Sequence, residues 1–313
     1  MDKTERYIAK IIFQNRILKY KGQQFEDFFV SIMTRANGQF QAVKAHGNLG
    51  DRKNDGFDPT TGTYYQVFAP GDISKDSTIY TGVKKLKEDF EKLYNSWNDI
   101  CPIKKFFFVV NDRFEGLPPP IIEMSIQLDN RPEYAGVKID TFTAKDLERI
   151  FDELDDFAKQ DIIGIIPDEI MTVVEYNALH ETVTYLLNTE LPEDYSDNLV
   201  VPDFDNKIVF NGLSPVVGHH LVTGSYQEGQ LMQYFNENPG VKEILQKKFR
   251  ALYEEAKVQI TDQTENCADR RFYYILEQAC PKRTMSVQTS VLVLMAYYFS
   301  SCDIFEEPDY DIT

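Results

Sequence analysis

The sequence has few cysteines, and their positions exclude two kinds of site. Four occur in 313 residues, and no two stand at the CxxC spacing of zinc sites and redox motifs. Their scatter gives no disulfide framework, so a reduced, cytoplasmic chain is expected. No apolar run approaches the roughly 18 residues of a membrane span. The charged stretch MDKTERYIAK lacks the apolar segment of a signal peptide, so none is predicted.

Several catalytic motifs are also missing. The sequence contains no GxSxG nucleophile motif and no HExxH metal motif, and its four histidines form no other ligand pattern. It has no GxxxxGK[ST] loop either, so this chain is not expected to bind ATP phosphates. Nucleophilic hydrolase chemistry and ATP binding therefore have no support in this sequence.

The charge of the chain is strongly one-sided. The net charge is −17, which by itself argues against binding DNA. The first 100 residues, however, carry 15 Lys and Arg against 13 Asp and Glu, whereas the remainder carries 18 against 37. The first segment is therefore the part that does not repel phosphate on average. The acidity elsewhere either keeps DNA away, fits a basic partner or serves solubility alone.

Apolar periodicity predicts alternating helices and strands in the first half of the chain. The expected helices are 4–20, a second one carrying Phe25 to Met33, 78–97 and 144–159, and the expected strands are 40–45, 63–69, 105–110 and 137–142. Strands separated by helices indicate an α/β domain with a mixed sheet flanked by helices. The order of helix, strands, helix and strand is that of a restriction-endonuclease-like core, although other α/β folds share it.

The second half of the chain is predicted to be mainly α-helical. Helices are expected at 168–188, 214–235, 239–260, 268–279 and 285–301, and the acidic stretch 189–206 looks like a linker. The predicted domains are 1–165, a connecting helix and linker at 166–206, and a helical domain at 207–313. Most of these aromatic and apolar positions are expected in the helical core: Tyr226, Leu231, Tyr234, Phe235, Phe249, Leu252 and Tyr253.

Oxygen-bearing side chains in the first 70 residues could hold a divalent metal. Phosphodiester cleavage with Mg²⁺ needs hard oxygen ligands that converge at the edge of a sheet. The candidates are Glu26 on the second helix, Gln66 within the strand YYQVF, and the carboxylates Asp51, Asp55 and Asp58 of the loop GDRKNDGFD.

Gln66 and Asp55 are the most informative of these. A lone amide in an apolar strand costs a few kcal/mol if it is buried without a partner, so a metal, a water, a phosphate or a neighbouring backbone group must satisfy Gln66. The glycine after Asp55 lets the backbone approach a metal closely. An Asx turn that closes the loop is the alternative explanation of the Asp55-Gly56 pair, and residue type alone favours it.

These residues resemble a known nuclease family. The stretch Phe25-Glu26, the segment 47–70 and the lysine-rich helix after Thr78 look like PD-(D/E)xK effectors of the Mrr and Cap4 type. That resemblance implies Asp55, Gln66 and Glu26 as ligands of Mg²⁺ or Mn²⁺ and double-stranded DNA as the substrate. The family's lysine should fall at position 68, where this sequence has Phe68.

A lysine from elsewhere would then have to complete the site. Lys84 is favoured, with Lys53, Lys85 and Lys87 as alternatives. The same lysines also fit the solvated face of an amphipathic helix, because acidic residues follow them at i,i+4 spacing. If no lysine reaches the site, the domain is a degenerate nuclease that only binds.

The second half resembles a different family. The segments 207–215, 224–235 and 238–256 look like the C-terminal domain of ABC-three-component systems, also called Lamassu. This resemblance implies a bacterial antiphage complex with an SMC-like ATPase subunit and a small third subunit. The effector would be held inactive there and would self-associate after release.

Three functions remain to be distinguished. The first is a Mg²⁺-dependent endonuclease effector with catalytic Glu26, Asp55, Gln66 and Lys84. The second is a non-catalytic adaptor that joins the ATPase to DNA or to another effector, for which Phe68 would be the signature. The third is a two-domain binding protein outside both families.

Overall fold

A computed structural model describes residues 1–44, 52–164, 174–190, 204–301 and 303–308. The chain divides into two compact units. One comprises residues 16–162, and the other combines residues 1–15 with 163–313. The helix α1 (Lys3–Lys19) therefore contributes its first part to one unit and its last residues to the other. Within the described ranges no helix is long and apolar enough to cross a membrane.

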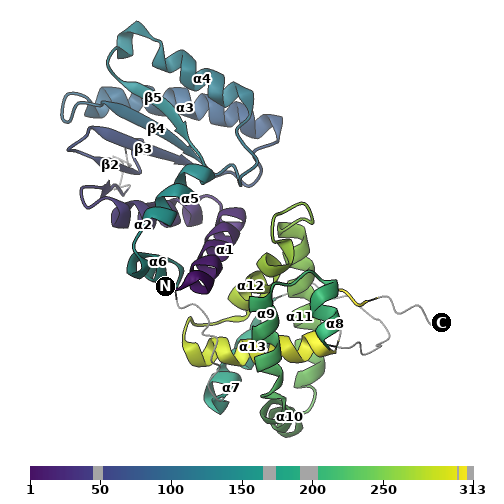
Figure 1. The fold of residues 1–313 in the computed structure, drawn as a ribbon. Helices are drawn as coiled ribbons and strands as arrows, with labels where there is room; N and C mark the ends of the chain where they lie inside the picture. Colours follow the sequence, from purple (N-terminus) through teal and green to yellow (C-terminus); the bar gives the residue numbers. More distant parts are fainter. Residues whose placement is uncertain (45–51, 165–173, 191–203, 302, 309–313) are drawn as a thin grey trace. The chain divides into compact units, whose positions relative to one another are not determined.

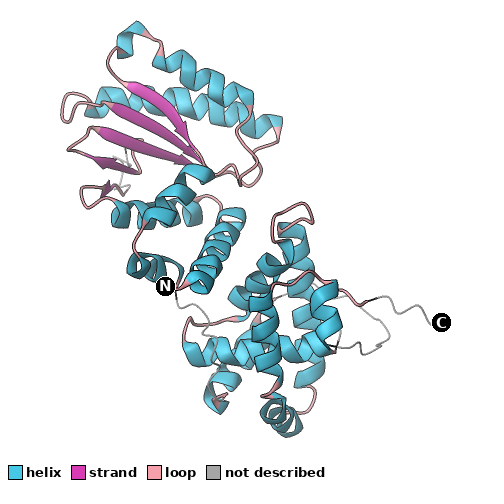
Figure 2. Ribbon diagram, in the orientation of Figure 1, coloured by secondary structure: helices cyan, strands magenta, loops and turns pink. Residues whose placement is uncertain are grey.

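A five-stranded mixed sheet forms the centre of the first unit, with strand order β1-β2-β3-β4-β5 (Figures 1 and 2). β1 pairs antiparallel with β2 and β2 with β3, whereas β3, β4 and β5 are parallel. The strands are β1 (Gln41–Ala42), β2 (Gly56–Asp58), β3 (Thr63–Phe68), β4 (Lys105–Val110) and β5 (Lys138–Phe142). This confirms the predicted fold class for this half of the chain.

Helices cover both faces of this sheet. The helices α3 (Asp76–Trp97) and α4 (Pro119–Asp129) connect the parallel strands and pack together on one face (Figure 1). Right-handed crossovers between strands added in the same direction place both helices on that face. On the other face α2 (Gln23–Ala36) packs on α5 (Ala144–Glu153). Phe29 of α2 contacts the ring of Tyr65 there, at a centroid distance of 5.6 Å.

Two predicted helices are each divided in the structure. The stretch expected as one helix over 144–159 forms α5 and then α6 (Asp156–Ile163). The stretch expected over 214–235 forms α9 (Pro215–Ser225) and α10 (Glu228–Glu237). Apolar spacing continues through both breaks, and for that reason periodicity alone did not detect them.

The second unit is built from helices throughout the part that the structure describes (Figure 2). This unit includes the first residues of α1 and resumes at residue 163. Its further helices are α7 (Tyr176–Asn188), α8 (Phe204–Phe210), α9, α10, α11 (Val241–Gln259), α12 (Cys267–Ala279) and α13 (Met285–Ser300). The mainly helical second half is thereby confirmed. Residues 204–206 of the expected linker begin α8, while 191–203 lie outside the described residues.

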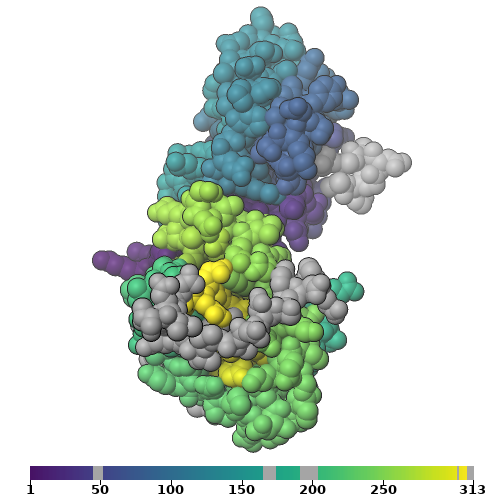
Figure 3. All heavy atoms as spheres, turned by 90° about the vertical axis from the view of Figure 1, so that its right-hand side faces the viewer, coloured from purple at the N-terminus to yellow at the C-terminus, as the bar shows by residue number. Residues whose placement is uncertain are grey.

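Helix α13 forms the core of this unit. Its residues 287–299 are all buried, and the yellow atoms of the chain's last part make up only a small area of the face drawn in Figure 3. Most of the expected core residues are buried: Leu231, Tyr234, Phe235, Phe249, Leu252 and Tyr253. Tyr226 is the exception, with an exposed fraction of 77%.

Candidate functional site

Asp55 and Gln66 lie in direct contact at the junction of β2 and β3. Gln66 Nε2 donates a hydrogen bond of 2.6 Å to Asp55 Oδ2. The backbone N–H of Val67 donates a second bond of 2.6 Å to the same oxygen, and the backbone N–H of Asp55 donates to the carbonyl of Tyr65. Both side chains are buried. The antiparallel pairing of β2 with β3 therefore brings together two residues that the sequence separates by a turn.

The amide oxygen of Gln66 is the feature that points to a ligand. Gln66 Oε1 is buried and has no hydrogen-bond partner among the described residues. A buried polar atom without a hydrogen bond lowers the free energy of unfolding by about 1–3 kcal/mol. The two ends of an amide are assigned from their neighbours, and a bound cation would favour turning Oε1 toward Asp55 Oδ2. Adjacent ligands in a Mg²⁺ octahedron with bonds of about 2.1 Å stand about 3 Å apart, so this pair fits a hard cation.

The backbone just before Asp55 adopts an uncommon conformation. Arg52 and Lys53 have φ angles of 52° and 66°, in the left-handed region that non-glycine residues rarely occupy. Asn54 follows and is fully buried, with Oδ1 accepting from the N–H of Gly56 at 3.1 Å. Its Nδ2 has no partner in the described part of the chain. Strain of this kind concentrates at functional sites, which supports this loop as one.

Glu26 is placed differently from the other two predicted ligands. Gly22 N donates to the carbonyl of Ala69 at 2.7 Å, which anchors the start of α2 at the end of β3. Glu26 lies on the first turn of that helix and accepts a hydrogen bond of 2.9 Å from Gln23. Helix α2 packs on the face of the sheet occupied by Tyr65, whereas Gln66 points to the opposite face.

The other acidic candidates add no further ligand. No group of three Asp, Glu, His or Cys side chains that could hold a metal occurs among the described residues. Asp51 lies outside those residues. A metal site would rest here on Asp55 and Gln66, and Glu26 stays a predicted third ligand.

Asp58 has a structural explanation. Its Oδ1 accepts from the backbone and hydroxyl of Thr60, and its Oδ2 accepts from Asn37 at 2.9 Å. Burial raises the pKa of this carboxyl, but these hydrogen bonds outweigh burial and hold the pKa well below its usual value. Asp58 closes the turn between β2 and β3 and is not directed at a ligand.

The lysines of α3 divide into two groups. Lys84 is 58% exposed and pairs with Glu88 at 3.8 Å, as i,i+4 spacing predicts. Lys85 instead pairs at 2.7 Å with Asp89, which also holds Lys53 at 3.3 Å. The i,i+4 spacing by itself predicts only an exposed ion pair between Lys85 and Asp89. The position of Asp89 three residues after Leu86 and four before Leu93, both fully buried, was the available signal that it faces inward.

Phe68 occupies the position of the lysine that the nuclease resemblance implies. Its ring stacks on Phe108 at a centroid distance of 5.7 Å, and a Cβ added at Gly82 would lie 3.0 Å from it. The space beside Gln66 on the strand is thus filled by an apolar side chain. A lysine ammonium group near Asp55 and Gln66 would therefore have to come from another helix, strand or loop.

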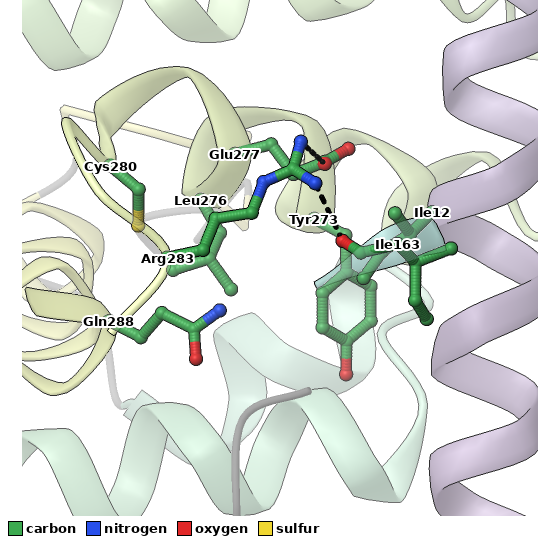
Figure 4. A pocket seen from close by; sticks show the side chains of 8 residues that line it. All are labelled: Ile12, Ile163, Tyr273, Leu276, Glu277, Cys280, Arg283 and Gln288. Carbon is green, nitrogen blue, oxygen red and sulfur yellow. Dashed lines mark hydrogen bonds and ion pairs between the residues drawn. The ribbon is translucent and has the colours of Figure 1, made fainter. Parts of the chain in front are cut away.

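The helical unit contains a small cavity of about 20 Å³ (Figure 4). Arg283, Glu277, Cys280 and Tyr273 are among its lining residues, and the Arg283 guanidinium donates to the carbonyl of Ile163 at 2.8 Å. Burial raises the pKa of the Cys280 thiol to about 12. A thiol with so high a pKa is a poor nucleophile, and the volume holds about one water. Neither property favours catalysis at this cavity.

The comparisons with known proteins bear on the helical half. Residues 177–306 match the family model for C-terminal domain 10 of the ABC-three component (ABC-3C) systems. The helical region is similar to that domain. This confirms the predicted resemblance of the second half to a C-terminal domain of ABC-three-component systems. No curated protein and no solved structure matches the chain, so the nuclease and Lamassu assignments stay predictions.

Proposed function

We propose that this protein is a metal-dependent DNA endonuclease subunit of an ABC-three-component antiphage system. The observation that carries the proposal is the buried Asp55–Gln66 pair, in which an amide oxygen is left without a partner beside a carboxylate. The family match of residues 177–306 supplies the context of a multi-component system. The mixed sheet with helices on both faces is compatible with a nuclease core.

The chemistry proposed is phosphodiester hydrolysis. A water oxygen forms a bond to phosphorus, the bond from phosphorus to the leaving deoxyribose oxygen breaks, and the proton of the water ends on that oxygen. Mg²⁺ or Mn²⁺ would supply Lewis-acid stabilisation and lower the pKa of bound water. Asp55 and Gln66 would hold the ion through Oδ and Oε1, and the fixed β2–β3 pairing would keep both oxygens in place.

The charge distribution supports a division of labour along the chain. The first 100 residues are close to neutral, whereas the remainder carries 37 acidic against 18 basic residues. Phosphate is attracted to the least acidic segment, and the acidic remainder repels it. We propose that the helical half binds partners of the complex, an SMC-like ATPase and a small third subunit. Release and self-association would then bring two nuclease units to opposite strands.

The second candidate function is a non-catalytic adaptor. Phe68 favours it, because the strand position expected to carry a lysine packs on Phe108 instead. An adaptor would keep the DNA-binding and partner-binding surfaces without cutting. Adding Mg²⁺ or Mn²⁺ would then cause no DNA cleavage.

Plasmid cleavage separates the two functions. The protein, alone and assembled with its partner subunits, is incubated with supercoiled plasmid and Mg²⁺, beside Asp55→Ala, Asp55→Asn and a control. The control is Asp140→Asn, which removes an exposed carboxylate from β5. The nuclease predicts cutting by wild type and Asp140→Asn, loss of at least about 100-fold in both Asp55 variants, and no cutting in EDTA. Absence of cutting by the assembled wild type, with DNA bound equally well with and without metal, would support the adaptor.

A further inference from the structure

Three segments of the first unit meet where the parallel strands β3 and β4 end, at one edge of the sheet (Figure 2). The backbone N–H of Asn111 donates to the carbonyl of Phe68 at 3.2 Å, so the pairing of the two strands continues to that edge. The side-chain amide of Asn111 donates to the carbonyl of Tyr20 at 3.0 Å, just after the end of α1. The bond from Gly22 to Ala69 lies there as well. Ligands of α/β sheets commonly bind outside the carboxyl ends of the strands, which makes this edge a candidate binding region.

The loop that follows β4 has a fixed and uncommon backbone. Arg113 and Phe114 have φ angles of 51° and 65°, so two residues other than glycine adopt the left-handed conformation in succession. The N–H of Arg113 donates to Asn111 Oδ1 at 3.2 Å, and the N–H of Gly116 donates to Asp112 Oδ2 at 3.1 Å. Asn111 and Asp112 are both buried. These contacts determine the point at which the Arg113 side chain leaves the loop.

The guanidinium group of Arg113 is a charged donor without a matching acceptor. Its Nη2 atom is buried and has no hydrogen-bond partner in the described chain, while Arg113 as a whole is half-buried. The carboxylate of Asp112 accepts the N–H groups of Gly116 and Ala144 instead, and Glu115, the other acid of the loop, is exposed. Arginine stays charged in proteins, and a charged donor removed from water is unfavourable without an acceptor. An anionic ligand would supply that acceptor.

A second cation stands next to this loop. Lys21 follows Tyr20, the residue whose carbonyl holds the Asn111 side chain. Lys21 is exposed and has no ion-pair partner among the residues that the structure describes. A Cβ built at Gly71 would meet nothing nearer than Lys21 Cδ at 3.8 Å, and a Cβ at Gly116 would meet nothing within 4 Å. The space beside the two loops is therefore open, and a guanidinium group and an ammonium group border it.

We propose that Arg113 and Lys21 form a phosphate-binding site at the carboxyl edge of β3 and β4, separate from the Asp55–Gln66 pair. The guanidinium fork matches two oxygens of one phosphate, and the ammonium group adds a point charge. The phosphate belongs to the DNA backbone, outside the bond that is cut. The site contributes to DNA binding and takes no part in the chemical step.

Distance along the strand favours a DNA phosphate over that of a free nucleotide. Gln66 lies two residues before Phe68, and a strand rises about 3.3 Å per residue, so the edge is about 7 Å from the candidate cation site. Each DNA strand carries one phosphate per about 3.4 Å of helix axis, so a backbone held at Gln66 presents further phosphates to this edge. The sequence has no GxxxxGK[ST] loop for the phosphates of a nucleotide. The DNA assignment rests on the proposed function, whereas the anion site itself does not.

Salt-dependent DNA binding tests the site without relying on cleavage. The full-length protein, alone and assembled with its partner subunits, is titrated into a fluorescently labelled duplex in EDTA, and anisotropy gives Kd over a range of KCl concentrations. Arg113→Gln should raise Kd about tenfold. It should also lower the slope of log Kd against log KCl concentration by about 0.9, equally for two unrelated duplex sequences. Lys21→Gln should act in the same direction. Lys105→Gln is the matched control, because it removes an exposed lysine from the opposite end of β4.

Further variants separate binding from a structural role. Arg113→Lys keeps the charge without the fork, so it should keep the salt slope and recover only part of the affinity. Thermal unfolding identifies a variant that fails to fold, and the exposed Lys21 then carries the test. A double variant of Arg113→Gln and Lys21→Gln with the Kd and salt slope of wild type would overturn the site. Binding of deoxyadenosine monophosphate that is lost in Arg113→Gln, with duplex binding unchanged, would overturn the DNA assignment. If the variants behave as expected but the wild type does not cut plasmid with Mg²⁺, the site stands and the proposed nuclease fails.

Discussion

The side-chain amide of Gln66 donates to Asp55 Oδ2 at 2.6 Å, and the next backbone N–H of the strand donates to the same oxygen. One carboxylate oxygen thereby joins the residue before β2 to the middle of β3. The arrangement satisfies the amide nitrogen and leaves the amide oxygen buried without a partner in the described part of the chain.

Gln66→Glu should make the stability of the first unit depend on pH and on metal. The new carboxylate would lie beside Asp55, and like charges so close raise the pKa of one of them. A carboxyl whose folded pKa is raised stabilises the fold at low pH, and this stability is lost as pH rises through the folded pKa. The melting temperature of the variant should therefore fall as the pH rises from 5 to about 8, and added Mg²⁺ should raise it again. Gln41→Glu, on exposed β1, is the control. Identical pH profiles for both would contradict the prediction.

Asp58→Ala should destabilise the turn between β2 and β3. The change leaves Thr60 and Asn37 without their acceptor, at a cost of about 1–3 kcal/mol in the free energy of unfolding at neutral pH. Because the folded pKa of Asp58 is lowered, its contribution is present above about pH 4 and is lost as pH falls. Urea unfolding at pH 7 and at pH 3 measures the difference, which should shrink in acid. Asp72→Ala, in an exposed turn with Ser74, should lose less.

Gly56→Ala should disturb the site through packing. A Cβ there would lie 2.1 Å from Phe40 Cζ, and the Phe40 ring already packs on Tyr65 at 5.9 Å. Overpacking of this kind costs about 1–3 kcal/mol, and because Gly56 follows Asp55 the shift should also lower cleavage. Gly71→Ala is the matched control, since its Cβ would meet nothing nearer than Lys21 Cδ at 3.8 Å. Equal melting temperatures for the two variants would refute this account.

Gly224→Ala should destabilise the helical unit. A Cβ at Gly224 of α9 would lie 2.9 Å from Ala296 Cβ and 3.0 Å from the backbone oxygen of Leu292, both on α13. The helices would have to separate, at a cost of about 1–3 kcal/mol. Gly229→Ala, in α10 with open space around it, should be neutral or stabilising, because alanine favours helix. Thermal unfolding with helix content as the probe compares them, and a Gly224 variant as stable as its control would exclude this close packing.

The candidate site was predictable in part from the sequence. Gln66 in an apolar strand required a partner, and Asp55 before a glycine was predicted to be a metal ligand, but a hydrogen bond between the two side chains was not predicted. The short strand that follows Asp55 was not predicted, because three residues carry too little periodicity to detect. Without that strand the direct contact between the two side chains could not be derived. The i,i+4 pairing of Lys84 with Glu88 was predicted correctly, since it depends on local helix geometry alone.

The sequence by itself determined most of the helices and strands and their order, because apolar spacing reports local backbone periodicity. It indicated a mixed α/β half followed by a helical half, and its C-terminal segments indicated the ABC-three-component type. Only the tertiary structure decided which lysines meet Asp89, on which face Gln66 points, and that the first 15 residues group with the helical unit. Those facts depend on strand pairing and helix crossing between residues far apart in the chain, and no local pattern encodes such contacts.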